Sequence, residues 1–173
     1  TRASRADPFR GKKWSALEGG TRVPCIIRHP GLIPPDWESA ALISAIDLLP
    51  SLAHACGIDL QQHSQSKPII DGLNVWPTLQ DNKEVTHPRQ DLLYWHGADG
   101  FQAIRKGSWK LFPNRRHAGL KGSGPALFNL EKDLQEKLDV SMEHPVKVAA
   151  LKKLAELRLS EIEKNKVALG GTK

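Results

Sequence analysis

Residues 11–28, GKKWSALEGGTRVPCIIR, form the stretch that decides the fold of this chain. The first half of this stretch is polar and contains three glycines, a composition typical of a loop. Its end, Val23 to Arg28, is a short apolar run with β-branched residues, and it stops at His29-Pro30-Gly31. Such a run is typical of a strand buried on both faces, so it predicts one strand of a mainly parallel sheet.

A helix is expected some twenty residues after this strand. Asp47 can cap its N-terminus, Pro50 is tolerated in its first turn, and Gly57 can end it. Apolar residues between these points recur at helical spacing and predict one apolar face: Leu48, Leu49, Leu52, Ala53 and Cys56. A strand followed by such a helix is half of an α/β layer.

The chain changes character after a polar, proline-containing segment at about 58–88. Four short apolar segments follow, separated by glycine-containing turns or loops: 92–96, 101–105, 109–112 and 127–130. This pattern predicts an antiparallel meander. Pro145 can start a final helix, which is expected to pack on the sheet through Val146, Ala149, Ala150, Leu154 and Leu157.

Composition places few limits on function. The chain has 173 residues, a formal net charge of +6 and 39% hydrophobic residues, which is ordinary for a globular protein and compatible with an anionic partner. No apolar run is long enough to predict a membrane span. Cys25 and Cys56 form no CxxC pair and are expected to be buried free thiols. The first seven residues read as neither a signal peptide nor a natural start, so a piece of a longer protein is expected.

Few motifs in the chain carry chemistry by themselves. None of the seven histidines stands in an HxxxH or HxH metal pair, and neither GxSxG nor GxxxxGK[ST] occurs. The basic cluster at 115–121 reads as a solvated loop or as an anion-contacting loop at the mouth of a site. Lys13 lies in a basic loop, where a lysine is by default only solvated.

Six segments in a fixed order nevertheless resemble the sulfatase family. They are KWSALEGGTRVP at 13–24, IIRHPG at 26–31, IDLLPSL at 46–52, DGL at 71–73, AIRKGSWKL at 103–111 and LFNLEKD at 127–133. The resemblance implies an α/β fold: the C-terminal end of an alkaline-phosphatase-like α/β/α catalytic domain, then a small antiparallel sheet packed with a C-terminal helix. Residues 1–86 would belong to the catalytic domain and 87–173 to the small subdomain.

The resemblance also implies roles for four residues. Lys13, five positions before Glu18, aligns with the family's sulfate-binding lysine, and that spacing favours it over the adjacent Lys12. A compact ammonium group suits a sulfate oxygen on which negative charge must be held as the ester breaks. Glu18 and Arg22 are expected to be structural, through a contact that holds the loop. His96 follows a strand whose end approaches the substrate pocket in the family, so it is expected to touch the sulfate or its alcohol portion, with a surface or core histidine as the equal alternative.

The remaining machinery of the family is expected upstream of this chain. A sulfatase uses a formylglycine nucleophile and a divalent metal, usually Ca²⁺, and no motif for either is present here. Cys25 lacks the Cys-x-Pro-x-Arg context that formylglycine formation needs. This fragment alone is therefore expected to be inactive. The family resemblance also suggests a periplasmic, secreted or lysosomal-type compartment.

Two other functions stay open at this point. A phosphate or phosphonate ester hydrolase of the same superfamily would differ in the upstream nucleophile. A non-catalytic module could use the loop at 115–121 to bind nucleic acid or a sulfated glycan. That loop lacks interleaved aromatic residues and the chain has no nucleic-acid fold signature, so a nucleic-acid partner is not expected. The expected partner is an aryl or carbohydrate sulfate ester.

Overall fold

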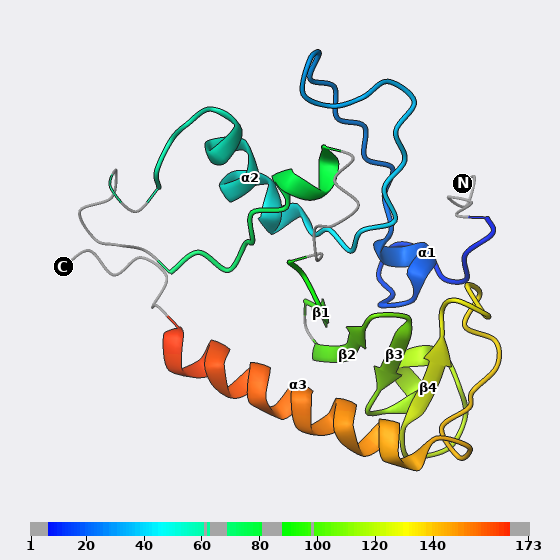
Figure 1. The fold of residues 1–173 in the computed structure, drawn as a ribbon. Helices are drawn as coiled ribbons and strands as arrows, with labels where there is room; N and C mark the ends of the chain where they lie inside the picture. Colours follow the sequence, from blue (N-terminus) through cyan, green and yellow to red (C-terminus); the bar gives the residue numbers. More distant parts are fainter. Residues whose placement is uncertain (1–6, 61, 63–68, 81–87, 98, 167–173) are drawn as a thin grey trace. The chain divides into compact units, whose positions relative to one another are not determined.

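The chain forms two compact units, seen in a computed structural model that describes residues 7–60, 62, 69–80, 88–97 and 99–166 (Figure 1). One unit joins Thr1–Pro24 to Asp91–Lys173, and the other is Cys25–Gln90. Most of the stretch at 11–28 therefore packs with the second half of the chain. The predicted boundary between residues 86 and 87 lies outside the described residues and stays a prediction.

The first unit is built on a four-stranded antiparallel sheet in the order β1-β2-β3-β4. The strands lie where the meander was predicted, and that prediction is confirmed: β1 is Asp91–His96, β2 is Gly100–Lys106, β3 is Trp109–Phe112 and β4 is Ala126–Asn129. The register places Leu111 of β3 between Ile104 of β2 and Leu127 of β4. Side chains alternate between the two faces, so each strand contributes to two separate cores.

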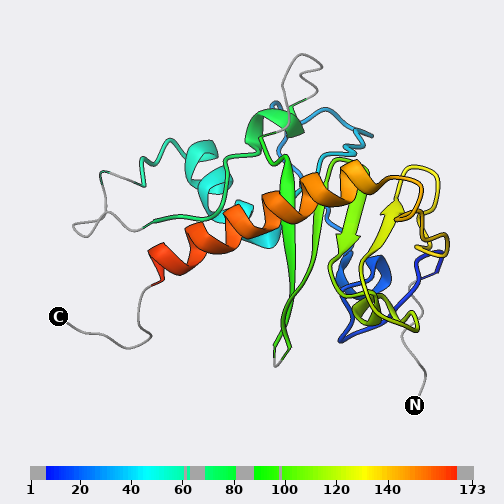
Figure 2. The same cartoon turned by 90° about the horizontal axis from the view of Figure 1, so that it is seen from below.

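Helix α3, Pro145–Asn165, covers one face of the sheet (Figure 2). Its existence confirms the prediction, but of the residues predicted to face the sheet only Leu154 packs against it. Val148, Leu151 and Ala155 are buried against the sheet, whereas Val146 is 83% exposed. A helix has more than one apolar stripe when small and large apolar residues are mixed, and the sheet selects the stripe that contains Leu151. Among the described residues, no helix is long and apolar enough to cross a membrane.

The opposite face of the sheet is covered by the segment that carries the Glu-Gly-Gly sequence. Ala16 and Leu17 of this segment pack in one core with inward-facing residues of the strands, among them Tyr94, Ala103, Phe112, Ala126 and Phe128. Short helix α1, Glu18–Thr21, follows directly. The segment is therefore fixed by its packing against this face of the sheet.

The second unit contains α2, Leu48–Ala55, with the short helical turns η1, Ala45–Asp47, and η2, Trp76–Leu79. Helix α2 confirms the predicted helix, but the Asp47 side chain does not cap it. The Asp47 carboxylate is fully buried and instead accepts hydrogen bonds from the Ser44 and Leu73 amides and from the Arg89 guanidinium. The carboxylate thus binds an ionised guanidinium and two amides outside α2 in place of the first amides of the helix.

Apolar residues of the run from Val23 to Arg28 and of α2 are more exposed than the sequence predicts. Val23 is 80% and Ile26 94% exposed, and Val23 to Arg28 forms no strand, which corrects the predicted buried strand. A strand needs a neighbour for its backbone groups, and the described residues contain only the antiparallel sheet, in which this run has no place. The predicted α2 face is likewise partly open, with Leu49 and Leu52 exposed. Both cysteines are free and exposed, which corrects the expectation that they are buried.

Candidate functional site

Lys13 lies at the tip of a tight turn that spans Lys12–Ser15. The Ser15 amide donates to the Lys12 carbonyl at 3.0 Å, and the Lys12 amide donates back to the Ser15 hydroxyl oxygen at 3.3 Å. Trp14, the third residue of the turn, has a φ of 74°, as the third position of a type II turn requires. The turn leaves the Lys13 side chain exposed.

The two glycines after Glu18 explain why this turn can sit where it does. A Cβ atom on Gly20 would lie 2.2 Å from the Ser15 carbonyl oxygen and 2.6 Å from that of Lys12. A Cβ atom on Gly19 would lie 2.6 Å from the Arg10 carbonyl oxygen, which accepts a 2.8 Å hydrogen bond from the Gly19 amide. Only glycine permits such backbone approach. The Gly-Gly pair thus buttresses the turn and fixes Lys13 relative to Glu18.

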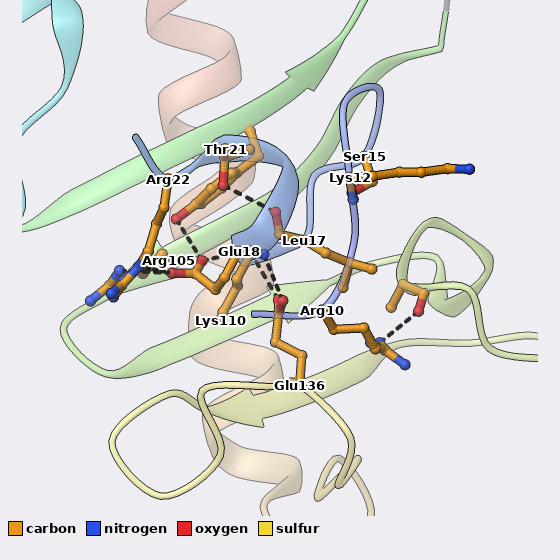
Figure 3. A network of polar contacts seen from close by, with 12 residues as sticks. Arg10, Lys12, Ser15, Leu17, Glu18, Thr21, Arg22, Arg105, Lys110 and Glu136 are labelled. Atoms are coloured by element: carbon orange, nitrogen blue, oxygen red, sulfur yellow. Dashed lines mark hydrogen bonds and ion pairs between the residues drawn. The ribbon is translucent and has the colours of Figure 1, made fainter. Parts of the chain in front are cut away.

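Glu18 is the centre of a buried polar network (Figure 3). Its Oε1 accepts a hydrogen bond from Lys110 Nζ at 2.8 Å and faces the Tyr94 hydroxyl at 3.4 Å. Its Oε2 accepts from Arg22 Nε at 2.7 Å and lies 3.5 Å from Arg105 Nη1. The contact between Glu18 and Arg22 expected from the sequence is present, and it is joined by three strand residues. The loop of Lys13 is thereby tied to β1, β2 and β3.

Glu136 completes this network from the other side. Its Oε2 accepts a 2.7 Å hydrogen bond from the Glu18 amide, and its Oε1 lies 3.0 Å from Lys110 Nζ. Lys110 and both carboxylates are fully buried. Sequence reasoning missed Glu136 because it lies in a segment that matches no motif. The available signal was Lys110 itself, whose place in a strand of buried residues calls for a buried counter-charge.

The two carboxyl groups have opposite pKa shifts. Burial raises the pKa of Glu18, but the nearby Lys110 charge and hydrogen bonds from Lys110 and Arg22 outweigh burial and hold that pKa below its usual value. Burial also raises the pKa of Glu136, and there Lys110 does not outweigh it, so the pKa of Glu136 lies above its usual value. Glu18 has more cationic partners than Glu136, which accounts for the difference.

The lowered pKa of Glu18 predicts acid sensitivity of this unit. A depressed pKa in the folded state contributes stability above the unfolded pKa, near 4.5, and that stability is lost as pH falls through the folded pKa. Glu136 works in the opposite sense, because its raised pKa contributes stability at low pH that is lost as pH rises. We therefore expect Glu18→Gln to flatten the loss of unfolding free energy below about pH 4.5, measured by urea denaturation across pH. Equal acid slopes for variant and parent would contradict this.

His96 comes close to the Lys13 turn through Trp14. His96 ends β1, is about one quarter exposed, and its Nδ1 lies 2.9 Å from Asp99 Oδ2. Its ring meets the Trp14 ring edge-on, with centroids 5.9 Å apart. Lys13 Nζ lies 5.3 Å from the same Trp14 ring. The structure therefore gathers both residues predicted to meet the substrate around one tryptophan, which sequence reasoning did not single out.

Trp95 and the basic loop at 115–121 make contacts with other residues of the fold. Trp95 is 52% exposed, and its ring packs edge-on against Phe101. In the basic loop, Arg115 pairs with Asp139 at 2.6 Å and Arg116 Nε donates to the Gly122 carbonyl at 3.3 Å. These contacts give both guanidinium groups a role within the fold.

No group of three or more metal-ligating side chains lies together in the part of the chain that the structure describes. The described residues thus do not fit a resident metal ion. The site they form is a positively charged turn with an imidazole and an indole beside it.

Comparison with solved structures identifies the class of protein to which this fold belongs. A sulfatase structure from Pseudoalteromonas sp. superposes with a TM-score of 0.77 over 93% of this chain and 34% of its own length, at 21% identity, which shows the fold. A structure from Bacteroides thetaiotaomicron, described with its metabolism of multiple glycosaminoglycans, superposes with a TM-score of 0.68 at 30% identity over 86% of this chain and 31% of its own. The fold is therefore that of one part of a sulfatase.

Sequence relatives agree with the fold. Mouse steryl-sulfatase is 31% identical over 78% of this chain, and N-acetylgalactosamine-6-O-sulfatase of Bacteroides thetaiotaomicron is 31% identical over 86%. No protein-family model matches the chain. The chain belongs to the sulfatase family. It spans only 25% and 29% of the length of these two relatives, as expected for a C-terminal portion.

Proposed function

We propose that this chain is the C-terminal part of a sulfuric ester hydrolase, in which Lys13 holds an oxygen of the sulfate group. The proposal rests on a difference between the charged side chains of the motif at 13–24. Glu18 and Arg22 are paired with each other, whereas the exposed Lys13 ammonium has no carboxylate partner among the described residues. A rigid turn with an unpaired cation at its tip is suited to bind an anion.

Lys13 acts by electrostatics in this proposal. Negative charge grows on the sulfate oxygens and on the leaving alcohol oxygen as the ester bond breaks. A fixed ammonium group lowers the energy of that state more than the energy of the bound ester, and this difference accelerates the reaction. Because the turn is already buttressed by Gly19 and Gly20, little reorganisation is needed when charge develops.

His96 is proposed to contact the substrate beside the sulfate. The carboxylate of Asp99 next to its Nδ1 orients the ring, so the other ring nitrogen is left to face the ester. With Asp99 at Nδ1, the neutral imidazole presents its other nitrogen as an acceptor, which can accept a hydrogen bond from a donor group of the alcohol portion. Trp14 links His96 to Lys13, because its ring contacts both side chains.

The nucleophile and metal belong to another part of the protein in this proposal. The family resemblance implies a formylglycine nucleophile and Ca²⁺, which would attack and polarise the sulfate group. The described residues offer no ligand cluster for the ion, and Cys25 is outside the required sequence context.

Activity of the longer protein tests the proposal. With 4-nitrophenyl sulfate and 4-nitrophenyl phosphate as substrates, we expect kcat/KM to be higher for the sulfate by at least about tenfold, and residues 1–173 alone to be inactive. Preference for the phosphate would identify a phosphate ester hydrolase of the same superfamily instead. Hydrolysis of no sulfate or phosphate ester, with salt-sensitive binding of a sulfated glycan, would identify a binding module.

A further inference from the structure

Trp14 has a backbone conformation that its residue type disfavours. A φ of 74° is common for glycine but rare and strained for a bulky aromatic residue. Glycine would fit the turn without this strain. The fold therefore holds a tryptophan where its own stability favours a glycine, a pattern that points to a function for the side chain.

The surroundings of the Trp14 ring show what it can bind. The ring is not a core element, since the residue is 73% exposed. It lies between the Lys13 ammonium, 5.3 Å from its centroid, and the His96 imidazole, which meets it edge-on. A sulfate held by Lys13 would bring the group esterified to it next to this indole. An aromatic surface binds the apolar C–H face of a ring well.

Polar groups beside the indole distinguish between kinds of ring. His96 contacts the indole ring, and the exposed carboxylate of Asp99 lies 2.9 Å from His96 Nδ1, so both side chains can form hydrogen bonds with hydroxyl groups. A pyranose ring offers an apolar face and hydroxyl groups around its edge. An aryl or steroid ring uses the aromatic surface but leaves these polar groups without partners.

We propose that Trp14 is the stacking surface for the sugar ring of a carbohydrate sulfate, with Asp99 and His96 as hydrogen-bonding partners for that ring. This rests on the sulfatase function proposed above. Lys13 fixes the sulfate and Trp14 fixes the plane of the ring that carries it. The indole is thus a specificity-determining residue, because a sulfate ester without a ring cannot use it.

Trp14→Gly separates this role from a structural one. In the longer protein, relief of backbone strain offsets the greater freedom of glycine in the unfolded chain, so the unfolding midpoint is expected to stay close to that of the parent. KM for monosaccharide 6-O-sulfates is expected to rise about tenfold, while kcat/KM for ethyl sulfate, which has no ring, is expected to fall much less. Trp14→Phe retains an aromatic face and is expected to recover part of the loss.

Trp95→Ala is the matched control, since Trp95 is also exposed but its ring contacts Phe101 instead. Its KM for the sugar sulfates is expected to match that of the parent. An unchanged KM in Trp14→Gly, an equal loss with ethyl sulfate, or a lowered unfolding midpoint overturns the proposal. A parent enzyme that cleaves aryl sulfates but no sugar sulfate overturns the carbohydrate assignment, whereas one that cleaves no sulfate ester overturns the sulfatase function itself.

Discussion

Lys13→Ala is expected to lower kcat/KM of the longer protein for sulfate esters by about 10²–10³-fold, the effect of removing one fixed group that stabilises charge in a transition state. The loss should appear mainly in kcat if the ammonium acts on charge that develops during the reaction. The fold should stay intact, because the Lys13 side chain is exposed and the turn is held by Ser15 and the backbone. Steady-state kinetics with 4-nitrophenyl sulfate, alongside an unfolding curve, measures both.

Lys12→Ala is the control for this variant. Lys12 is exposed, adjacent and equally charged, and it joins the turn only through its backbone. It is expected to keep near-parental kcat/KM, because five-residue spacing to Glu18 selects Lys13. If Lys13→Ala has near-normal activity, the assignment of Lys13 is wrong. If Lys12→Ala shows the loss of kcat/KM instead, Lys12 and not Lys13 is the sulfate-binding lysine.

Local sequence patterns predicted the sheet and its helix because both depend on short-range periodicity. Alternating apolar residues and glycine turns define β1 to β4 with few competing registers. The face of α3 could not be predicted in the same way. Which stripe packs depends on the partner surface, and Ile104, Leu111 and Leu127 select the stripe of Leu151.

The predicted strand at Val23 to Arg28 shows a different limit. The residue types favour a strand, but strand formation requires a neighbouring strand that can pair with its backbone. The chain belongs to a family whose members are about three to four times as long, and it spans 25% and 29% of two relatives. The apolar run and the exposed α2 residues Leu49 and Leu52 are therefore compatible with burial in the longer protein.

The site was only partly predictable for a geometric reason. Lys13 and Glu18 lie in one motif, and resemblance alone located them. Trp14 could not be singled out, because its left-handed conformation follows from the turn and not from the residue type. Glu136 is 118 residues from Glu18 in sequence, and only the fold of the intervening strands brings its carboxylate to the Glu18 amide.

Lys110→Met is expected to destabilise the protein by about 3–5 kcal/mol, the effect of breaking a buried ion pair by removing one partner. Lys110 Nζ lies 2.8 Å from Glu18 Oε1 and 3.0 Å from Glu136 Oε1, and no part of the lysine reaches solvent. Methionine fills similar volume but leaves two buried carboxyl groups without their shared cation. Urea denaturation followed by tryptophan fluorescence measures the change in unfolding free energy.

Two further variants show whether charge, and not packing, causes this loss. Lys106→Met makes the same substitution at the exposed end of β2 and is expected to change stability by less than about 0.5 kcal/mol. Lys110→Met combined with Glu136→Gln removes the carboxylate that loses its cation in Lys110→Met, while Glu18 keeps Arg22 and Arg105. The double variant should therefore be more stable than Lys110→Met alone, with a coupling energy above about 0.5 kcal/mol. Strictly additive losses would mean that Lys110 and Glu136 do not act as a pair, and the loop of Lys13 would then be held mainly by Arg22 and the glycine contacts.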